Sequence, residues 1–298
     1  MRLRTLPLSL AGVVCGGLLA MGGLGHNGNW WAFILLLLTA CSLQILSNLS
    51  NEMGDYRSGV DGEGREGPNY SMTDGGLTVK QMWRAINGTV ALCAVSGLLM
   101  LLFSFQFSIF NFQFVSLLAL GAAAIWAATH YTLGKKPYGY VGLGDLFVFI
   151  FFGLVSVLGS FFVLAHDIHW YYILPASGIG LLSVAVLNVN NIRDMQSDKG
   201  IRKTVPLRIG VRRAKWYQTV LVSLGWLLMA GSYYGNTTFS WLILCTLPLF
   251  IWHIVGVWRR EGKSLDPMLP LLVMSTFLLS LLYSLGTLLL LWPTISTR

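Results

Sequence analysis

Long apolar stretches recur along the whole chain, and they constrain its fold more than any other feature. Of the 298 residues, 55% are hydrophobic and only 11% are charged, whereas a soluble domain carries about 25% charged residues. About 20 apolar residues are needed for one helix to cross a bilayer. Backbone polar groups in lipid must bond within their own segment, so these stretches are expected to be helices. The predicted fold is therefore an all-α, polytopic membrane helical bundle of nine transmembrane helices. The expected spans are roughly 6–25, 30–50, 80–103, 113–133, 141–164, 170–190, 215–234, 239–258 and 267–292.

The basic residues fall almost entirely on one side of these spans. When successive loops are assigned to alternate sides, 19 of the 20 Lys and Arg residues share a side, and only Arg298 falls on the other. Cytoplasmic loops are enriched in Lys and Arg, so this side, with the N-terminus, is predicted to be cytoplasmic. The net charge of +8 is spread over short loops rather than gathered into a patch, which argues against nucleic-acid binding.

Two acidic motifs stand at the cytoplasmic ends of the second and sixth spans. Asn51 precedes Asp55 by four residues, Asn190 precedes Asp194 by four, and the two pairs are offset by the same 139 positions. Residues four apart share one face of a helix. Matching motifs on spans that run in the same direction indicate a pseudo-repeat of helices 1–4 and 5–8, followed by helix 9, in a single domain over residues 1–298. Such a repeat would place the motifs across a central cavity.

The residue types in these motifs indicate a divalent metal site. Mg²⁺ prefers hard oxygen ligands and is usually held by one or two carboxylates together with phosphate oxygens of a substrate. Solvated helix ends with charge pairs are the alternative explanation, but they account poorly for a matched set in both halves. Asp61 does not share the face of Asp55 and is expected to return from a loop after Gly59. The predicted metal ligands are Asn51, Asp55, Asp61, Asn190, Asp194 and Asp198.

The two motifs are predicted to hold the metal against a diphosphate, which would leave as pyrophosphate. Basic residues near the motifs are candidates for neutralising its charge. Lys135 and Lys136 lie in a short turn after Tyr131, and the sequence does not choose between them. Arg193, Lys199, Arg202 and Lys203 cluster around the second motif. For all of these, ordinary positive charge in a cytoplasmic loop is the alternative.

The paired motifs resemble those of the UbiA superfamily of intramembrane prenyltransferases. Within it the chain most resembles the 1,4-dihydroxy-2-naphthoate polyprenyltransferases of menaquinone biosynthesis, through Arg4-Thr5-Leu6-Pro7, Gln44–Asn48 and Gly139–Asp145. The resemblance covers nearly the whole chain. One departure is Glu52, where relatives often have Asp, and we expect it to be tolerated.

This resemblance implies nine helices, Mg²⁺ as cofactor, a polyprenyl diphosphate donor and a dihydroxynaphthoate acceptor. The acceptor would lose CO₂ and the donor pyrophosphate, which gives demethylmenaquinone. It also implies that Tyr131 and one nearby lysine contact the diphosphate. The predicted catalytic residues are Asp55, Asp194, Lys135, Lys136 and Tyr131. The predicted substrate-binding residues are Asn48, Arg57, Arg193, Lys199 and Lys203. The expected location is the bacterial cytoplasmic (inner) membrane, with the lipid bilayer as partner and the active site on the cytoplasmic side.

Two alternatives stay open at this point. A prenyltransferase of the same superfamily could use another acceptor, such as 4-hydroxybenzoate or haem. A cation or solute transporter is the alternative of a different class. Its binding site would be expected near the bilayer midplane, whereas these acidic residues lie at the cytoplasmic edge.

Overall fold

The computed structural model describes residues 3–23, 29–59, 72, 75–106, 108, 111–232 and 241–295. All regular secondary structure within these ranges is helical. The first part contains α1 (Leu6–Gly23), α2 (Trp30–Ser58), α3 (Val79–Ser104) and α4 (Phe112–His130). The middle part contains α5 (Gly144–Val148), the π-helix η3 (Phe149–Gly159), α6 (Ser160–Ala165), α7 (Ile173–Arg193) and α8 (Met195–Asp198). The last part contains α9 (Val205–Ile209), α10 (Val211–Gly231), α11 (Trp241–Leu244), α12 (Leu247–Arg259) and α13 (Met268–Ile295).

Local capping residues fix where the helices near the first motif begin and end. The Asn29 side chain accepts a hydrogen bond from the backbone N–H of Ala32 at 3.0 Å and starts α2. Gly59 ends α2 with a left-handed φ of 74°, a conformation that glycine adopts without steric cost. Thr78 and Gln81 form a capping box at the start of α3, which satisfies two backbone donors at once. α2 therefore extends beyond its apolar stretch and carries Asn51 and Asp55 on its last turns.

Seven of the described segments are long and apolar enough to cross a membrane. They are Trp30–Ser58, Val79–Ser104, Phe112–His130, Gly144–Ala165, Trp170–Arg193, Trp241–Arg259 and Gly262–Leu288. α1 is shorter, and α10 begins with a basic stretch; neither belongs to this set. The all-α membrane fold is confirmed, while the count of nine spans stays a prediction, as does the repeat of helices 1–4 and 5–8.

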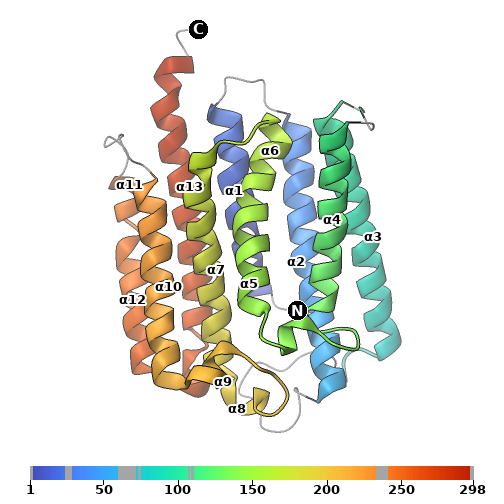
Figure 1. Cartoon of the computed structure of the whole chain (residues 1–298), viewed down its shortest axis with the longest axis vertical. Helices are drawn as coiled ribbons and strands as arrows, with labels where there is room; N and C mark the ends of the chain where they lie inside the picture. Colours follow the sequence, from blue (N-terminus) through green and yellow to red (C-terminus); the bar gives the residue numbers. More distant parts are fainter. Residues whose placement is uncertain are drawn as a thin grey trace.

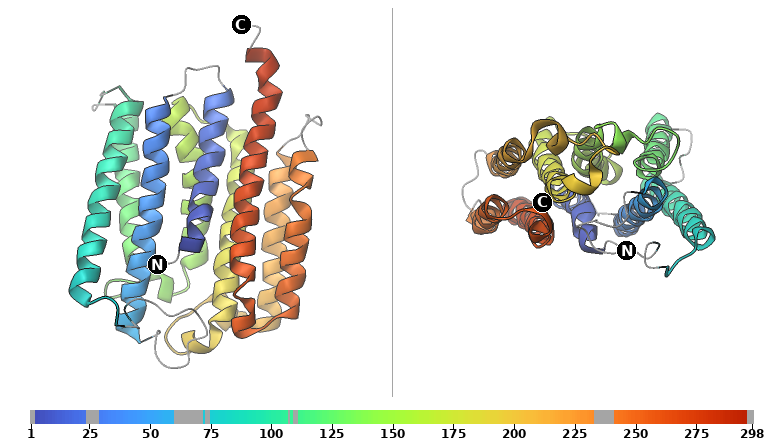
Figure 2. Two further views of the ribbon diagram at one scale, coloured as in Figure 1. Left: turned by 180° about the vertical axis from the view of Figure 1, so that it is seen from behind. Right: turned by 90° about the horizontal axis from the view of Figure 1, so that it is seen from below.

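The long helices stand side by side in two rows (Figure 1; Figure 2, right). α10, α7, the α5–η3–α6 rod and α4 form one row, and α12, α13, α1, α2 and α3 form the other. Glycines allow the closest contacts between neighbours: a Cβ on Gly153 of η3 would lie 2.6 Å from the Cα of Gly180 on α7. The C-terminal ends of α2 and α7 lie at the same end of the molecule. The two acidic motifs are thus brought to one end of the bundle.

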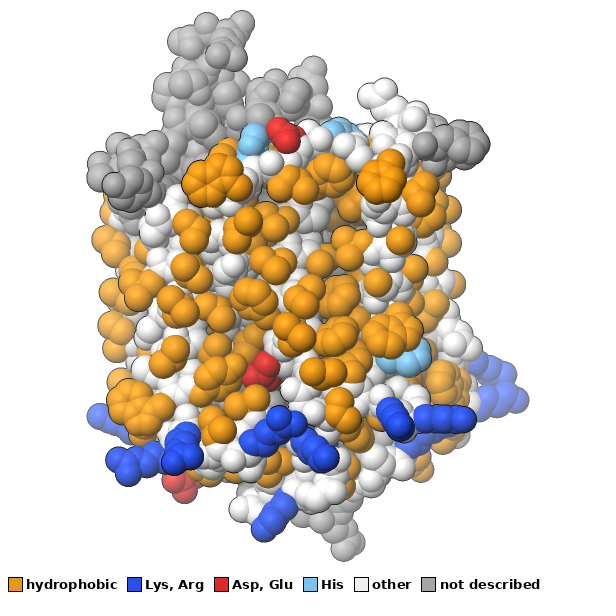
Figure 3. All heavy atoms as spheres, viewed as in Figure 1, with side chains coloured by type: hydrophobic (Ala, Val, Ile, Leu, Met, Phe, Trp, Pro, Cys, Tyr) orange, Lys and Arg blue, Asp and Glu red, His pale blue; other side chains and the backbone are white. Residues whose placement is uncertain are grey.

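The surface of this bundle is apolar over its middle and basic at one end. Figure 3 shows hydrophobic side chains over most of one face, with Lys and Arg gathered at the end where α8 and α9 lie. Large apolar side chains such as Trp126, Leu146 and Trp216 are exposed. A protein of this size in water would not leave so many of them unburied. The pattern fits a bundle surrounded by lipid, with one basic rim.

Candidate active site

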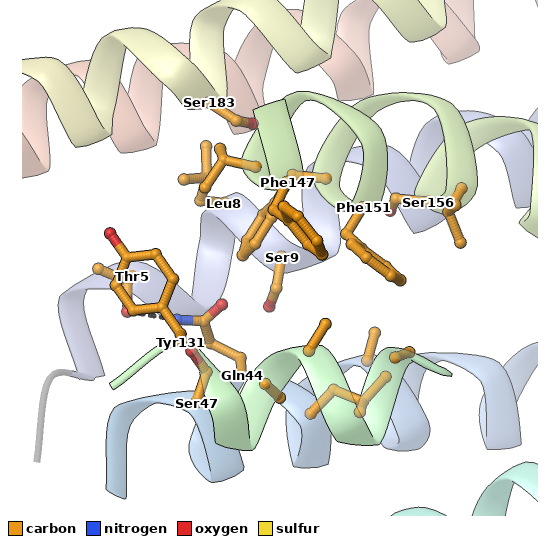
Figure 4. Close-up of a pocket in the computed structure, with 18 of the residues that line it drawn as sticks. Thr5, Leu8, Ser9, Gln44, Ser47, Tyr131, Phe147, Phe151, Ser156 and Ser183 are labelled. Atoms are coloured by element: carbon orange, nitrogen blue, oxygen red, sulfur yellow. Dashed lines mark hydrogen bonds between the residues drawn. The ribbon is translucent and has the colours of Figure 1, made fainter. Parts of the chain in front are cut away.

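A cavity of about 340 Å³ lies between the two rows of helices and reaches the acidic motifs. Asn51, Asp55 and Asn190 line its polar end together with Arg202. Its opposite part is apolar, with Phe147, Phe151 and Val155 on one wall and the Leu117–Ala128 face of α4 on the other. Figure 4 shows Phe147 and Phe151 projecting into this space across from α4. A pocket of this size with a few convergent polar groups is typical of a ligand site.

The first motif is held against the turn that follows α4. The Thr132 hydroxyl donates to Ser50 O at 2.8 Å and contacts Asn51 Oδ1 at 3.2 Å. A Cβ on Gly54 would lie 2.5 Å from the Thr132 side chain, so the glycine permits this approach. The Asp55 carboxylate is almost completely buried and accepts a hydrogen bond from the Tyr140 hydroxyl at 3.1 Å. The carboxylate is therefore fixed in place at the mouth of the cavity.

The second motif lies where α7 gives way to α8. The α-helix is interrupted at Asp194, yet the backbone N–H of Asp198 still donates to Asp194 O at 2.9 Å. Asp198 is therefore carried one turn beyond Asp194, and it is 1% exposed. Asn190 Nδ2 donates to Asp194 Oδ2 at 3.2 Å. The second motif is thus a bent helix end rather than one continuous helical face.

Arg193 neutralises Asp194 within a buried network. Its Nε and Nη2 donate to the two carboxylate oxygens of Asp194, each at 2.7 Å. Its Nη1 donates to Asp266 at 2.6 Å, and Asp266 also accepts from Arg4 at 3.0 Å. Bidentate arginine–carboxylate pairs of this kind are strong and geometrically specific. The network joins the N-terminal segment, the end of α7 and the segment just before α13.

Arg202 joins the two motifs to each other. Its guanidinium forms an ion pair with Asp55, and its Nε lies 3.6 Å from Asp198 Oδ1. The same guanidinium packs over the Tyr140 ring, 4.8 Å from its centroid. Burial lowers the pKa of Arg202, but Asp55 and Asp198 outweigh burial and raise it above its ordinary value. One permanently charged group therefore lies between the acidic residues of both motifs.

Tyr131 lines the same cavity. Burial raises the pKa of its phenol to about 12, against the opposing effect of Arg202. The hydroxyl therefore stays protonated near neutral pH. It can donate a hydrogen bond to an anion but cannot serve as an anionic base.

The described residues fit a magnesium ion held jointly with a substrate. Within these ranges no three His, Cys, Asp or Glu side chains converge into a metal-binding group. The site offers instead two carboxylates, Asp55 and Asp198, and the amide oxygens of Asn51 and Asn190, which accept hydrogen bonds from Thr132 and Arg193. This donor set is all hard oxygen, and Mg²⁺ is commonly held by one or two carboxylates plus phosphate oxygens. The chain would thus supply part of the coordination shell, and the ligand the rest.

The other predicted site residues differ in where the structure places them. Asn48 lines the cavity. Arg193 is fully buried, with its guanidinium committed to Asp194 and Asp266. Five predicted contacts lie on exposed surface at the basic end, and their roles stay predictions: Arg57, Lys135, Lys136, Lys199 and Lys203. Asp61 lies outside the described residues. The predicted metal-ligand roles of the other five residues also stay predictions: Asn51, Asp55, Asn190, Asp194 and Asp198.

Three residues of the site were not predicted to function there. The sequence places Arg202 in the basic cluster but does not predict it as a substrate contact, although its spacing of four residues from Asp198 is a usable signal. Tyr140 and Gln44 enter the sequence analysis only through the segments that carry the family resemblance. Gln44 lies four residues before Asn48 and seven before Asn51, so the helical repeat places all three on one face.

Comparison with known proteins gives consistent matches over the whole chain. The model of the UbiA prenyltransferase family matches residues 9–282. The 1,4-dihydroxy-2-naphthoate octaprenyltransferase of Escherichia coli (strain K12) is 38% identical over 303 residues, which cover 98% of this chain and 94% of that protein. The enzyme of the same name from Haemophilus influenzae is 36% identical and covers 96% of this chain and 94% of its own length.

Solved structures share the fold at low sequence identity. A UbiA homolog from Aeropyrum pernix K1 superposes with a TM-score of 0.69 at 15% identity, covering 97% of this chain and 98% of that one. A UbiA homolog from Archaeoglobus fulgidus bound to GPP and Mg²⁺ superposes with a TM-score of 0.63 at 17% identity, covering 99% of both chains.

Proposed function

The chain belongs to the UbiA prenyltransferase family, and we propose that it transfers a polyprenyl group from a polyprenyl diphosphate to 1,4-dihydroxy-2-naphthoate. The observation that carries this proposal is the convergence of Asp55 and Asp198 on Arg202 at the polar end of an apolar cavity. A prenyl diphosphate has the same two-part chemistry, with a charged head and an apolar tail. The relatives that span nearly the whole chain are named for the naphthoate acceptor.

The reaction joins the donor and the acceptor by a new carbon–carbon bond, and each of them loses one group. The bond between the allylic carbon of the donor and its diphosphate oxygen breaks, and a ring carbon of the acceptor bonds to the allylic carbon. The ring carboxyl group leaves as CO₂ and pyrophosphate leaves from the donor. The product is a prenylated naphthalenediol, which is the reduced form of demethylmenaquinone.

The residues at the polar end would bind and stabilise the diphosphate. Asn51, Asp55, Asn190 and Asp198 would hold Mg²⁺, with Asp61 and Asp194 as further predicted ligands; the ion would neutralise charge on the departing pyrophosphate. Arg202 supplies a fixed positive charge beside them, and Tyr131 a neutral O–H donor. Preorganised charges and donors in a site shielded from water are usually the largest contribution to catalysis of this kind.

The apolar part of the cavity would protect the allylic carbon and direct the tail. Phe147 and Phe151 line this part, and aromatic faces attract cationic charge. Each CH₂ group kept from water contributes about 0.8 kcal/mol to binding. The cavity therefore favours a prenyl donor over a hydrophilic phosphate ester.

The same proposal places the protein in the bacterial cytoplasmic membrane with its site on the cytoplasmic side. The basic rim in Figure 3 lies at the end that carries both motifs, and Lys and Arg are enriched in cytoplasmic loops. A charged diphosphate donor and a carboxylated acceptor would both reach the site from that side.

The direct test is turnover by the purified protein. Detergent-solubilised protein is given dihydroxynaphthoate, a polyprenyl diphosphate and Mg²⁺, and products are identified by mass spectrometry. We expect a prenylated naphthalenediol, no product after chelation of Mg²⁺, and a loss of about 100-fold or more in Asp55→Ala. Asp167→Ala, at the opposite end of the molecule, is the control and should retain activity. Full activity in a folded Asp55→Ala protein would contradict the assigned role.

The same assay separates the alternatives. A preference for 4-hydroxybenzoate or haem, offered in equal amounts with dihydroxynaphthoate, would move the chain to another branch of the superfamily. Flux of cations or solutes into proteoliposomes, without prenylated product, would favour a transporter.

A further inference from the structure

A second polar region lines the cavity, distinct from the acidic motifs. It is formed by the start of the chain and the middle of α2. Its members are Arg4, Thr5, Ser9, Gln44, Ser47 and Asn48. Figure 4 shows Gln44 between Thr5 and Ser9, on the wall across from Phe147. Neither the metal ligands nor the diphosphate contacts proposed above account for this region.

The amide of Gln44 is held in one orientation by its neighbours. Its Nε2 donates to Thr5 Oγ1 at 3.0 Å and to Asn48 Oδ1 at 3.3 Å. Asn48 Nδ2 in turn donates to Thr5 Oγ1 at 3.3 Å, which closes the triangle. Because both contacts of the Gln44 amide nitrogen are to oxygen atoms, its carbonyl oxygen must point the other way.

That carbonyl oxygen lacks a hydrogen-bond partner within the described part of the chain. Gln44 is 7% exposed, and its Oε1 has no hydrogen-bond partner among the residues that the structure describes. Leaving a buried acceptor without a hydrogen bond destabilises a protein. Gln44 lies on the wall of the cavity, and its amide nitrogen is held by two hydrogen bonds. Its carbonyl oxygen can therefore accept a hydrogen bond from a ligand.

The position of Gln44 relates this oxygen to the reacting groups. It lies seven residues before Asn51 on α2, which is two helical turns or about 10 Å along the axis. It is therefore deeper in the cavity than the diphosphate end, at a level where an aromatic acceptor would meet the allylic carbon. An amide oxygen accepts hydrogen bonds only, so it selects a hydroxyl group and has no attraction for a carboxylate.

We propose that Gln44, oriented by Thr5 and Asn48, recognises the aromatic acceptor by accepting a hydrogen bond from one of its ring hydroxyl groups. This inference rests on the proposed function, because it assigns the acceptor's place in that reaction. Gln44 is a binding residue for the hydroxylated ring, whereas Thr5 and Asn48 are positioning residues. The interaction fixes which edge of the ring faces the allylic carbon.

The test measures binding of acceptors that differ by one hydroxyl group. With dihydroxynaphthoate as the substrate, 1-hydroxy-2-naphthoate and 4-hydroxy-2-naphthoate are compared as competitive inhibitors, in wild type and in Gln44→Met, whose side chain has a similar shape and no amide. We expect wild type to bind one of the monohydroxy compounds about tenfold more weakly than the other. Gln44→Met should bind both equally, with an acceptor KM about tenfold higher and an unchanged KM for the prenyl diphosphate. Gln113→Met is the matched control and should behave as wild type, because Gln113 lies at the start of α4, at the opposite end of that helix from the acidic motifs.

The outcomes separate this inference from the function on which it rests. A wild-type protein that does not prenylate dihydroxynaphthoate overturns the proposed function and this inference together. An active wild type whose discrimination survives in Gln44→Met overturns this inference alone. If Gln44→Met does not fold, wild type decides by itself, because equal affinity for both monohydroxy compounds would exclude a specific hydroxyl contact.

Discussion

At the scale of single residues, the site is dominated by buried charges that neutralise one another. Arg202 is 10% exposed at its side chain, and its partner Asp55 is 2% exposed. Removing one member of a buried ion pair typically costs about 3–5 kcal/mol, because the other charge is left unpaired in a poor solvent. Asp198 shares the same guanidinium, so three charged groups depend on each other here.

This dependence predicts the behaviour of Arg202→Ala. Without the guanidinium, Asp55 and Asp198 repel each other at the mouth of the cavity, and the thermal midpoint of the metal-free protein should fall by several degrees. Mg²⁺ can replace the missing positive charge, so it should raise the midpoint of Arg202→Ala more than that of wild type. Thermal unfolding with and without Mg²⁺, in the absence of substrate, measures both effects.

Arg213→Ala is the matched control, because Arg213 is exposed on α10. Its midpoint should follow wild type in either condition. Two results would show that Asp55 and Asp198 do not share one cation-binding site. They are an Arg202→Ala midpoint equal to that of wild type without metal, or an Arg202→Ala midpoint that Mg²⁺ does not change.

The motif residues could be predicted from the sequence, but their partners could not. Asn51 and Asp55 were identified because carboxylates and amides at helical spacing are unusual at the end of an apolar span. Arg202 reaches Asp55 across 147 positions of sequence, and no local pattern reveals such a contact. The same holds for Asp266, which lies just before α13 and forms ion pairs with Arg193 and Arg4. For Lys135 and Lys136 the sequence shows a basic loop near a motif, but it does not show that both side chains lie on the exposed surface.

At the scale of the elements, close backbone contacts at glycines set the shape of the cavity wall. η3 carries Phe151 and Val155 on the cavity side and approaches α7 through Gly153. A Cβ at Gly153 would lie 2.6 Å from Gly180 Cα and 2.7 Å from Ala176 O. Backbone atoms cannot move aside as a flexible side chain can, so a larger residue must push the two helices apart.

Gly153→Ala should therefore destabilise the protein, by about 1–3 kcal/mol, through overpacking. It should also weaken binding of the prenyl diphosphate, because η3 and the aromatic residues it carries are displaced. Gly88→Ala on α3 is the matched control, since a Cβ there meets no atom within 4 Å. Thermal midpoints and donor KM values of the two variants test this, and equal midpoints would mean that η3 and α7 can separate without cost.

Hydropathy predicted where most spans lie, but not how each helix is wound or where it ends. The second span was expected over 30–50, whereas α2 continues to Ser58 because helical hydrogen bonding persists in polar sequence until Gly59. The fifth span was expected from residue 141, yet α5 begins at Gly144, after a turn in which Gly142 adopts a φ of 92°. The apolar pattern carries no signature of the π-helical winding of η3, which packs against α1 and α7.

At the scale of the whole molecule, composition predicts the class of fold and the distribution of charge predicts its orientation in the membrane. The apolar stretches predicted a helical membrane bundle, which the structure confirms. The two rows of helices, and the cavity between them, could not be predicted, because they depend on which helices pack together across long stretches of sequence. The separation of charge between the two ends is visible in Figure 3 and gives an orientation that can be measured directly.

Orientation is testable by labelling single cysteines with a membrane-impermeant maleimide. Of the native cysteines, Cys245 is exposed, so Cys245→Ser provides the parent protein. Lys263→Cys at the basic end should react only after the cells are broken, whereas Asp167→Cys at the opposite end should react in intact spheroplasts. This follows because Lys and Arg are retained on the cytoplasmic side during insertion. The opposite pattern would place both acidic motifs outside the cell, where a cytoplasmic prenyl diphosphate could not reach them, and would contradict the proposed cytoplasmic location of the site.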